Sequence, residues 1–190
     1  TAPATGHGSA VNWDDAICCV IPSTQEIVVV AAADASTPRV WRYNPRDETW
    51  TDGYNGAAAI TVGDPFELAC DPETEALYLW MGDGNAAFGI IGLRSTDKGA
   101  TWGIYSRAHF DTSTGTLSRF RVAVQPNKPW IGVGATSAGL ISTWYSEDKG
   151  VHWKQVESNA GMASSAQVDV AALKSGGYIV AYDEGSGVAP

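Results

Sequence analysis

Two stretches of this sequence carry one pattern, Ser95-Thr-Asp-Lys-Gly-Ala-Thr-Trp102 and Ser146-Glu-Asp-Lys-Gly-Val-His-Trp153. Both read Ser-x-Asp-x-Gly-x-x-Trp, and they lie 51 residues apart. The Asp side chain can accept N–H bonds within its own turn, Gly allows a positive φ, and Trp can be buried beneath a hairpin. The pattern therefore predicts structural turns built from Ser95, Asp97, Gly99, Trp102, Ser146, Asp148, Gly150 and Trp153.

A weaker third copy precedes these two. Residues 43–50 read Tyr-Asn-Pro-Arg-Asp-Glu-Thr-Trp, and Trp50 lies 52 residues before Trp102. This copy lacks the Gly, and its Asp47 stands three residues before the Trp instead of five. It is closer to the hairpin of a Kelch repeat.

A second repeat lies upstream of each pattern. Four six-residue segments align without gaps, and each is followed by a turn and a second apolar run: 17–22, 67–72, 121–126 and 169–174. Each repeat therefore predicts four strands, in units at about 14–54, 65–106, 117–157 and 166–190, the last incomplete. Four-stranded units of about 40–50 residues are typical of a β-propeller. We expect an all-β single domain over 1–190, with about 3.5–4 blades and almost no helix.

The composition excludes several other classes. The chain has 12 basic and 21 acidic residues, a net charge of −9 and 44% hydrophobic residues. A disordered chain would be less apolar and more charged, and no basic stripe is present to bind nucleic acid. No run of 18 apolar residues indicates a membrane span.

The pattern Ser-x-Asp-x-Gly-x-x-Trp resembles the Asp-box, or BNR repeat, of β-propellers in the sialidase-like superfamily. That family includes sialidases, plant-polysaccharide hydrolases, sortilin-type receptors and photosystem assembly factors. The resemblance implies the fold and places the boxes at the blade periphery, where they are structural. It leaves the function open, because the family is functionally mixed.

In the family, the first strand of each blade lines the central channel, and ligands bind near that axis. The alignment puts Ile17, Glu67, Arg121 and Asp169 at equivalent positions. Three interpretations of Glu67, Arg121 and Asp169 remain open. These residues form a ring of ion pairs, or they bind a ligand, or they are catalytic. In the catalytic interpretation Glu67 and Asp169 are the two carboxylates of a glycoside hydrolase.

Other chemistry has little support. Only Arg121 and Arg119 of the seven arginines fall on an expected inner strand, and no Arg-Ile-Pro segment occurs, so a sialidase arginine triad is not expected. His7, His109 and His152 are scattered, so we expect no metal and no cofactor. The aromatic residues Trp41, Trp80, Trp130 and Trp144 are expected between blades, with sugar stacking as the alternative.

The cysteines do not form a disulfide framework. Cys18, Cys19 and Cys70 are expected as small buried hydrophobic residues. A bridge from Cys18 or Cys19 to Cys70, or a reactive thiol, is the alternative.

The fourth unit stops after two expected strands. Residues 1–13, with Val11-Asn-Trp13 as the core piece, could supply a strand to it; a second chain, a partner or a larger propeller could also complete it. We therefore expect self-association or a partner chain, and no nucleic acid. The preferred function is a non-catalytic, extracellular, secreted or virion-associated module for binding or assembly, with a glycan or protein partner. The alternative is a sialidase-like glycoside hydrolase or a fragment of one.

Overall fold

The structure is a computed structural model that describes residues 12–34, 37–55, 62–83, 89–109, 117–136, 139–159 and 167–182. Within these ranges every regular element is a β-strand. The strands form three four-stranded sheets and one two-stranded sheet, each antiparallel and in chain order. We call these sheets blades 1 to 4.

Blade 1 contains β1 (Asn12–Val20), β2 (Ile27–Asp34), β3 (Thr37–Asn44) and β4 (Thr49–Asn55). Blade 2 contains β5 (Val62–Cys70), β6 (Leu77–Asp83), β7 (Gly89–Ser95) and β8 (Gly103–His109). Blade 3 contains β9 (Leu117–Ala123), β10 (Trp130–Thr136), β11 (Ile141–Ser146) and β12 (Lys154–Asn159). Blade 4 contains β13 (Val168–Ala172) and β14 (Tyr178–Tyr182).

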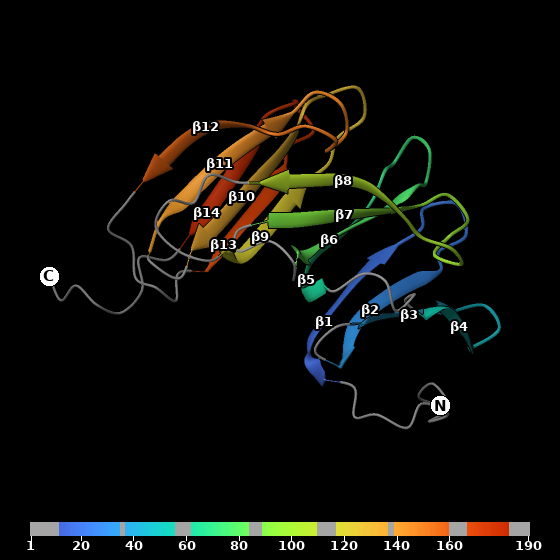
Figure 1. Ribbon diagram of the computed structural model, residues 1–190. Helices are drawn as coiled ribbons and strands as arrows, with labels where there is room; N and C mark the ends of the chain where they lie inside the picture. Colours follow the sequence, from blue (N-terminus) through green and yellow to red (C-terminus); the bar gives the residue numbers. More distant parts are fainter. Residues whose placement is uncertain are drawn as a thin grey trace, which may run out of the picture.

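The blades succeed one another along the chain, from blue to red in Figure 1. The first strands of successive blades contact each other, β1 with β5, β5 with β9, and β9 with β13. Radial repetition of four-stranded meanders with their first strands innermost is the propeller arrangement. The all-β propeller expected from the sequence is therefore confirmed.

Three hydrophobic clusters fill the spaces between blades. Leu77 and Leu79 of β6 join the cluster shared with blade 1, whereas Tyr78 and Trp80 join the cluster shared with blade 3. A smaller cluster, with Val133 and Val168 among its members, joins blades 3 and 4. Successive side chains of a strand point to opposite faces, so a blade between two others needs apolar residues at consecutive positions.

The four tryptophans considered for sugar stacking are buried between or within the blades. Trp41, Trp80, Trp130 and Trp144 are 3%, 1%, 1% and 2% exposed. The stacking alternative is therefore wrong for these residues, because a ring that is covered by neighbouring strands cannot receive a sugar.

The start of β1 corrects one expectation. Asn12 pairs with Ala32 of β2, so Asn12 and Trp13 extend the inner strand of blade 1. They do not add a strand to the last blade, because their backbone is already engaged in blade 1. Residues 1–11, which include Val11 and His7, lie outside the described residues. No helix of the described ranges is long and apolar enough to cross a membrane.

Candidate functional site

The inner strands bring together the three charged residues that the repeat places in register. Arg121 Nε of β9 lies 3.9 Å from Glu67 Oε2 of β5, and their side chains are 32% and 21% exposed. Asp169 of β13 is exposed, and it is close enough for its charge to raise the pKa of Glu67. The cluster therefore spans blades 2, 3 and 4. Blade 1 has the apolar Ile17 at the equivalent position, packed against the core.

Burial dominates the electrostatics of Glu67. It raises the pKa of this carboxyl from 4.5 to about 7. The Arg121 guanidinium and the backbone N–H groups of Leu68 and Val122 oppose this rise, and the Asp169 charge adds to it. The Leu68 N–H donates to Glu67 Oε1 at 3.1 Å. Desolvation disfavours the charged form more strongly than these contacts favour it, so the carboxyl exchanges its proton near neutral pH.

This arrangement suits proton transfer. A carboxyl that titrates near pH 7 can both hold and release a proton under physiological conditions. A second carboxylate nearby and a guanidinium that can bind oxygen atoms complete a polar cluster at the propeller axis. Glycoside hydrolysis usually depends on two carboxyl groups whose different environments give them different pKa values.

Two thiols lie between blades 1 and 2. Cys19 and Cys70 both pack against the core between blades 1 and 2. Burial raises the pKa of both thiols, that of Cys70 to about 11. The nearby Cys70, Cys18 and Glu67 add to the rise at Cys19. All three cysteines are free, with Cys18 exposed, so the structure contains neither bridge considered from the sequence.

The first Ser-x-Asp turn is held by its own side chains. Asp97 Oδ1 accepts bonds from the Ser95 hydroxyl and from the Thr101 N–H, both at 2.8 Å. Ser95 Oγ accepts the Gly99 N–H at 2.8 Å, and Trp102 Nε1 donates to the Gly99 carbonyl at 3.1 Å. The side chains of Ser95, Asp97 and Trp102, which define the pattern, are thus hydrogen-bonded within the turn.

The second turn repeats this geometry. Asp148 Oδ1 accepts from the Ser146 hydroxyl and the His152 N–H at 2.8 Å each, and Ser146 Oγ accepts the Gly150 N–H at 2.7 Å. Trp153 packs into the cluster between blades 2 and 3. Burial raises the pKa of Asp97 and of Asp148, but the hydrogen bonds outweigh it, so both carboxyls remain below their usual pKa. These carboxylates hold the turns together through their hydrogen bonds.

The weak third copy forms a different turn between β3 and β4. Asn44 Oδ1 accepts the Arg46 N–H at 3.0 Å, and Asn44 Nδ2 donates to Asp47 Oδ2 at 2.8 Å. The rings of Tyr43 and Trp50 lie 5.0 Å apart. An Asn therefore replaces the Ser–Asp pair, which fits the shorter spacing between Asp47 and Trp50.

Sequence reasoning missed the contacts that the turns make with the preceding blade. Lys149, inside the second pattern, bonds to Asp71 of blade 2 at 2.7 Å and lies 3.5 Å from Glu73. Lys98, inside the first pattern, lies 3.6 Å from Glu26 of blade 1. Both patterns carry Lys directly after the Asp, and this shared lysine was a signal of a common contact. The repeat alone does not show which neighbouring residue the lysine contacts.

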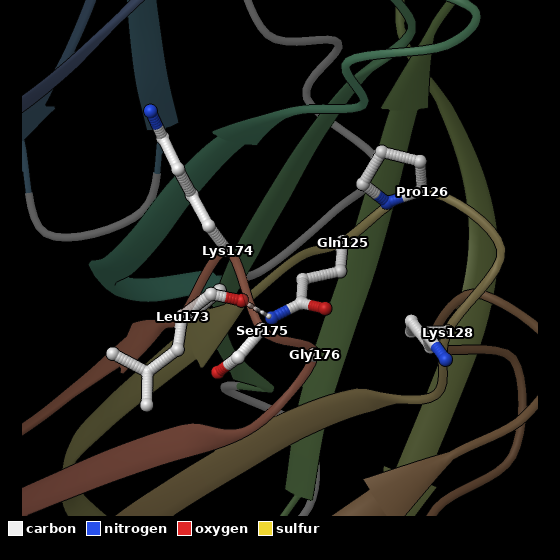
Figure 2. A pocket seen from close by; sticks show the side chains of 8 residues that line it. Gln125, Pro126, Lys128, Leu173, Lys174, Ser175 and Gly176 are labelled. Carbon is white, nitrogen blue, oxygen red and sulfur yellow. Dashed lines mark hydrogen bonds between the residues drawn. The ribbon is translucent and has the colours of Figure 1, made fainter.

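A depression of about 410 Å³ lies where the β9–β10 and β13–β14 turns meet. Figure 2 shows Gln125 at its centre, with the amines of Lys128 and Lys174 pointing apart. Gln125 Nε2 donates to the carbonyls of Leu173 and Gly177 at 3.1 Å each. These bonds hold the two turns together beneath the depression.

Among the described residues, no group of three or more His, Cys, Asp and Glu side chains is arranged to hold a metal ion. His152 is exposed and pairs with Asp148, at 2.6 Å between Nδ1 and Oδ2. Arg119 lies on β9, as expected, with its Nε 3.4 Å from Gln167 Oε1.

Several solved structures with a similar fold are glycoside hydrolases. An exo-β-1,3-galactanase of Phanerochaete chrysosporium matches with a TM-score of 0.59 and 13% identity, over 78% of this chain and 36% of that chain. An α-L-arabinofuranosidase of Fusarium graminearum matches with a TM-score of 0.62 and 16% identity, over 96% of this chain and 64% of that chain. A sialidase of Streptococcus pneumoniae matches with a TM-score of 0.55 and 17% identity, over 73% of this chain and 22% of that chain.

These matches agree with the observed class of fold, a β-propeller. The chain spans 36%, 64% and 22% of the three enzymes. Identities this low show the fold alone. No protein-family model and no curated protein matches the sequence.

Proposed function

We propose that this chain carries the carbohydrate site of a β-propeller glycoside hydrolase. The observation that carries the proposal is Glu67, a carboxyl at the propeller axis whose pKa is raised to about 7 beside a second carboxylate, Asp169. The similarity of the fold to three glycoside hydrolases supports it. The similarity therefore favours the alternative function, a sialidase-like glycoside hydrolase or a fragment of one, over the non-catalytic module.

In this proposal Glu67 is the proton donor. Its protonated carboxyl gives its proton to the glycosidic oxygen as the bond to the anomeric carbon breaks. Asp169 is exposed, and its carboxylate stabilises the positive charge that develops on the sugar ring and takes the proton of the attacking water. Arg121 binds a hydroxyl or carboxylate oxygen of the sugar and keeps the Glu67 pKa from rising further.

The test is hydrolysis of a panel of aryl glycosides. The probes are 4-nitrophenyl β-galactoside, 4-nitrophenyl α-L-arabinofuranoside and 4-methylumbelliferyl sialoside. Glu67→Gln and Asp169→Asn should each lower kcat/KM by about 10²-fold or more. Glu147→Gln is the matched control, because this exposed carboxylate lies on a turn, where it pairs with Lys154 at 3.6 Å. Activity should fall above pH 7, as Glu67 loses its proton.

Absence of turnover by the parent chain on every probe would contradict the proposed hydrolase activity. Equal activity of the control and both site variants would overturn the assignment of residues. Circular dichroism of each variant shows that a loss of activity is not a loss of fold.

A second candidate is a non-catalytic binding or assembly module, extracellular or virion-associated. The ion pair of Glu67 with Arg121 favours it, because the guanidinium stabilises the ionised carboxylate, which has no proton to donate. This function predicts binding of a glycan without turnover. Arg121→Gln should abolish that binding.

A further inference from the structure

A second polar pair lies beside the Glu67 cluster, which consists of Glu67, Arg121 and Asp169. Arg119 and Arg121 project from the same face of β9, because successive side chains point to opposite faces and the register of β9 is regular from Arg119 to Arg121. Arg119 Nε donates to Gln167 Oε1 at 3.4 Å, and Gln167 directly precedes β13. The pair therefore joins blades 3 and 4 on the face of the strands that carries the cluster.

The distance between this pair and the cluster suits a chain of sugars. Alternate residues of a strand lie about 6.6 Å apart, and this distance is comparable to the length of one sugar residue in a glycan. Arg119 stands two residues before Arg121, and Gln167 stands two residues before Asp169. A sugar bound at the Glu67 cluster would therefore place a neighbouring sugar beside Arg119 and Gln167.

The opposite direction along the strands offers no polar side chains. Ala69, Ala123 and Ala171 stand two residues after the three members of the Glu67 cluster. Ala69 and Ala123 are only 9% and 6% exposed. Methyl groups form no hydrogen bonds with sugar hydroxyls, so a glycan gains polar contacts only when it extends towards Arg119.

The Arg119 guanidinium retains donors for an anion. Its Nε donates to Gln167, and its Nη1 donates to the Ser118 carbonyl at 3.0 Å. No group of the described residues engages Nη2. A guanidinium has five N–H donors in one plane, so two parallel N–H groups can still bind the two oxygens of a carboxylate.

Charge favours an anion over a neutral hydroxyl at this place. The chain carries a net charge of −9, so its overall field repels acidic ligands. At the axis, in contrast, two guanidinium groups, Arg119 and Arg121, stand near a single carboxylate, Asp169, when Glu67 holds its proton. Charge-assisted hydrogen bonds from arginine are stronger than those between neutral groups.

We propose that Arg119 and Gln167 form a subsite for the carboxylate of a hexuronic acid residue that neighbours the sugar bound at the Glu67 cluster. The inference rests on the proposed function, because it takes the cluster as the place of the sugar whose glycosidic bond breaks. Arg119 binds the carboxylate, and Gln167 orients the guanidinium through its Nε. The substrate class is therefore an acidic glycan, and Arg119 determines specificity without touching the reacting atoms.

The test measures binding beside Arg119 and needs no turnover. Nitrogen-15 NMR follows the side-chain N–H signals of Arg119 and Gln167 while methyl β-D-glucuronide, methyl β-D-glucoside or acetate is added. The glucoside lacks the carboxylate, and acetate lacks the sugar. Arg119→Gln removes the guanidinium. Arg46→Gln is the matched control, because Arg46 is an exposed arginine on the turn between β3 and β4.

We expect the glucuronide to shift both signals and to bind about tenfold more tightly than either the glucoside or acetate. Arg119→Gln should weaken glucuronide binding by about tenfold or more, as followed at Gln167, whereas Arg46→Gln should leave it unchanged. Equal affinity for the glucuronide and either comparison ligand would overturn the subsite. Glucuronide binding that survives Arg119→Gln would also overturn it.

Failure of the subsite and failure of the hydrolase are distinguishable. Hydrolysis of an aryl glycoside by a chain that does not bind the glucuronide selectively overturns the subsite and leaves the proposed function in place. Selective, Arg119-dependent binding of the glucuronide by a chain that hydrolyses none of the aryl glycosides supports the subsite and contradicts the hydrolase alone.

Discussion

Lys149 Nζ lies 2.7 Å from Asp71 Oδ2, across the boundary between blades 2 and 3. The side chain of Asp71 is 2% exposed, and it also accepts the Glu73 N–H at 3.0 Å and the Thr74 hydroxyl at 2.9 Å. The lysine belongs to the outer turn of blade 3, and the aspartate belongs to the inner turn of the preceding blade, blade 2. The pair therefore links two repeats that share no sheet.

Removal of one partner should destabilise the chain more than removal of both. Lys149→Met leaves the buried Asp71 carboxylate without its cation, and we expect a loss of about 1–2 kcal/mol, limited by the partial exposure of the lysine. The double variant with Asp71→Asn should recover part of this loss. Urea unfolding of both single variants and the double variant measures the coupling. A coupling of zero would mean that the pair is energetically irrelevant.

The same pair predicts an acid dependence of stability. Burial raises the pKa of Asp71, but the bond from Lys149 and the other donors outweigh it, so the folded pKa lies below 3.8. A lowered carboxyl pKa contributes stability above its unfolded value, and this contribution disappears as pH falls through the folded value. The difference between the parent chain and Asp71→Asn should therefore shrink below about pH 4. Unfolding free energies at pH 3 and pH 6 check this.

The two pattern glycines should respond differently to alanine. Both have a positive φ, 86° at Gly99 and 88° at Gly150. A Cβ at Gly150 would lie 2.6 Å from the Tyr105 hydroxyl, whereas at Gly99 its nearest neighbour would be Val40 at 3.4 Å. Gly99→Ala should cost about 1 kcal/mol through backbone strain, and Gly150→Ala about 2–3 kcal/mol.

The control for this comparison is Tyr105→Phe, which removes the clashing oxygen. Gly150→Ala should cost less in the Tyr105→Phe background than in the parent chain. If the two alanine variants lose equal stability, the close contact with Tyr105 has no energetic consequence.

Glu67 should lower stability at alkaline pH. Its pKa is about 7 in the folded chain and 4.5 as an isolated group. A raised carboxyl pKa means that ionisation opposes folding, from pH 4.5 upward and in full above about pH 7. Glu67→Gln should therefore be more stable than the parent at pH 8, by at most about 3 kcal/mol, and nearly equal to it at pH 4.

Carbon-13 NMR titration of the Glu67 carboxyl reports the same pKa directly. Arg121→Gln should raise it and Asp169→Asn should lower it, because these charges act in opposite directions. A midpoint near 4.5 in the parent chain would contradict both the burial argument and the role of Glu67 as proton donor.

The three thiols should react in a fixed order. Cys18 is exposed, whereas burial raises the pKa of Cys19 and Cys70. Only the thiolate is nucleophilic. Iodoacetamide at pH 8 should modify Cys18 first, as measured by mass spectrometry of peptides over time. Faster labelling of Cys19 than of Cys18 would contradict the predicted burial.

Much of the fold could be predicted from the sequence because the repeat is a local property. Two turns of the same pattern, 51 residues apart, and four aligned inner strands each follow from nearby residues, through turn bonds and alternating apolar positions. The register that aligns Glu67, Arg121 and Asp169 was also readable. Of the ways considered to complete the last blade, a strand from residues 1–13 is contradicted at Asn12, which pairs with Ala32 of blade 1. The sequence does not show which partner strand a short segment pairs with.

The sequence by itself determined the strands, their turns and their grouping into blades, since these depend on contacts within about 50 residues. Only the tertiary structure decided the contacts between blades and their effects on burial and pKa. It placed Lys149 on Asp71, buried the four tryptophans and raised the Glu67 pKa. Those properties depend on desolvation and on charges brought close by packing, and neither is set by the order of residues along one strand.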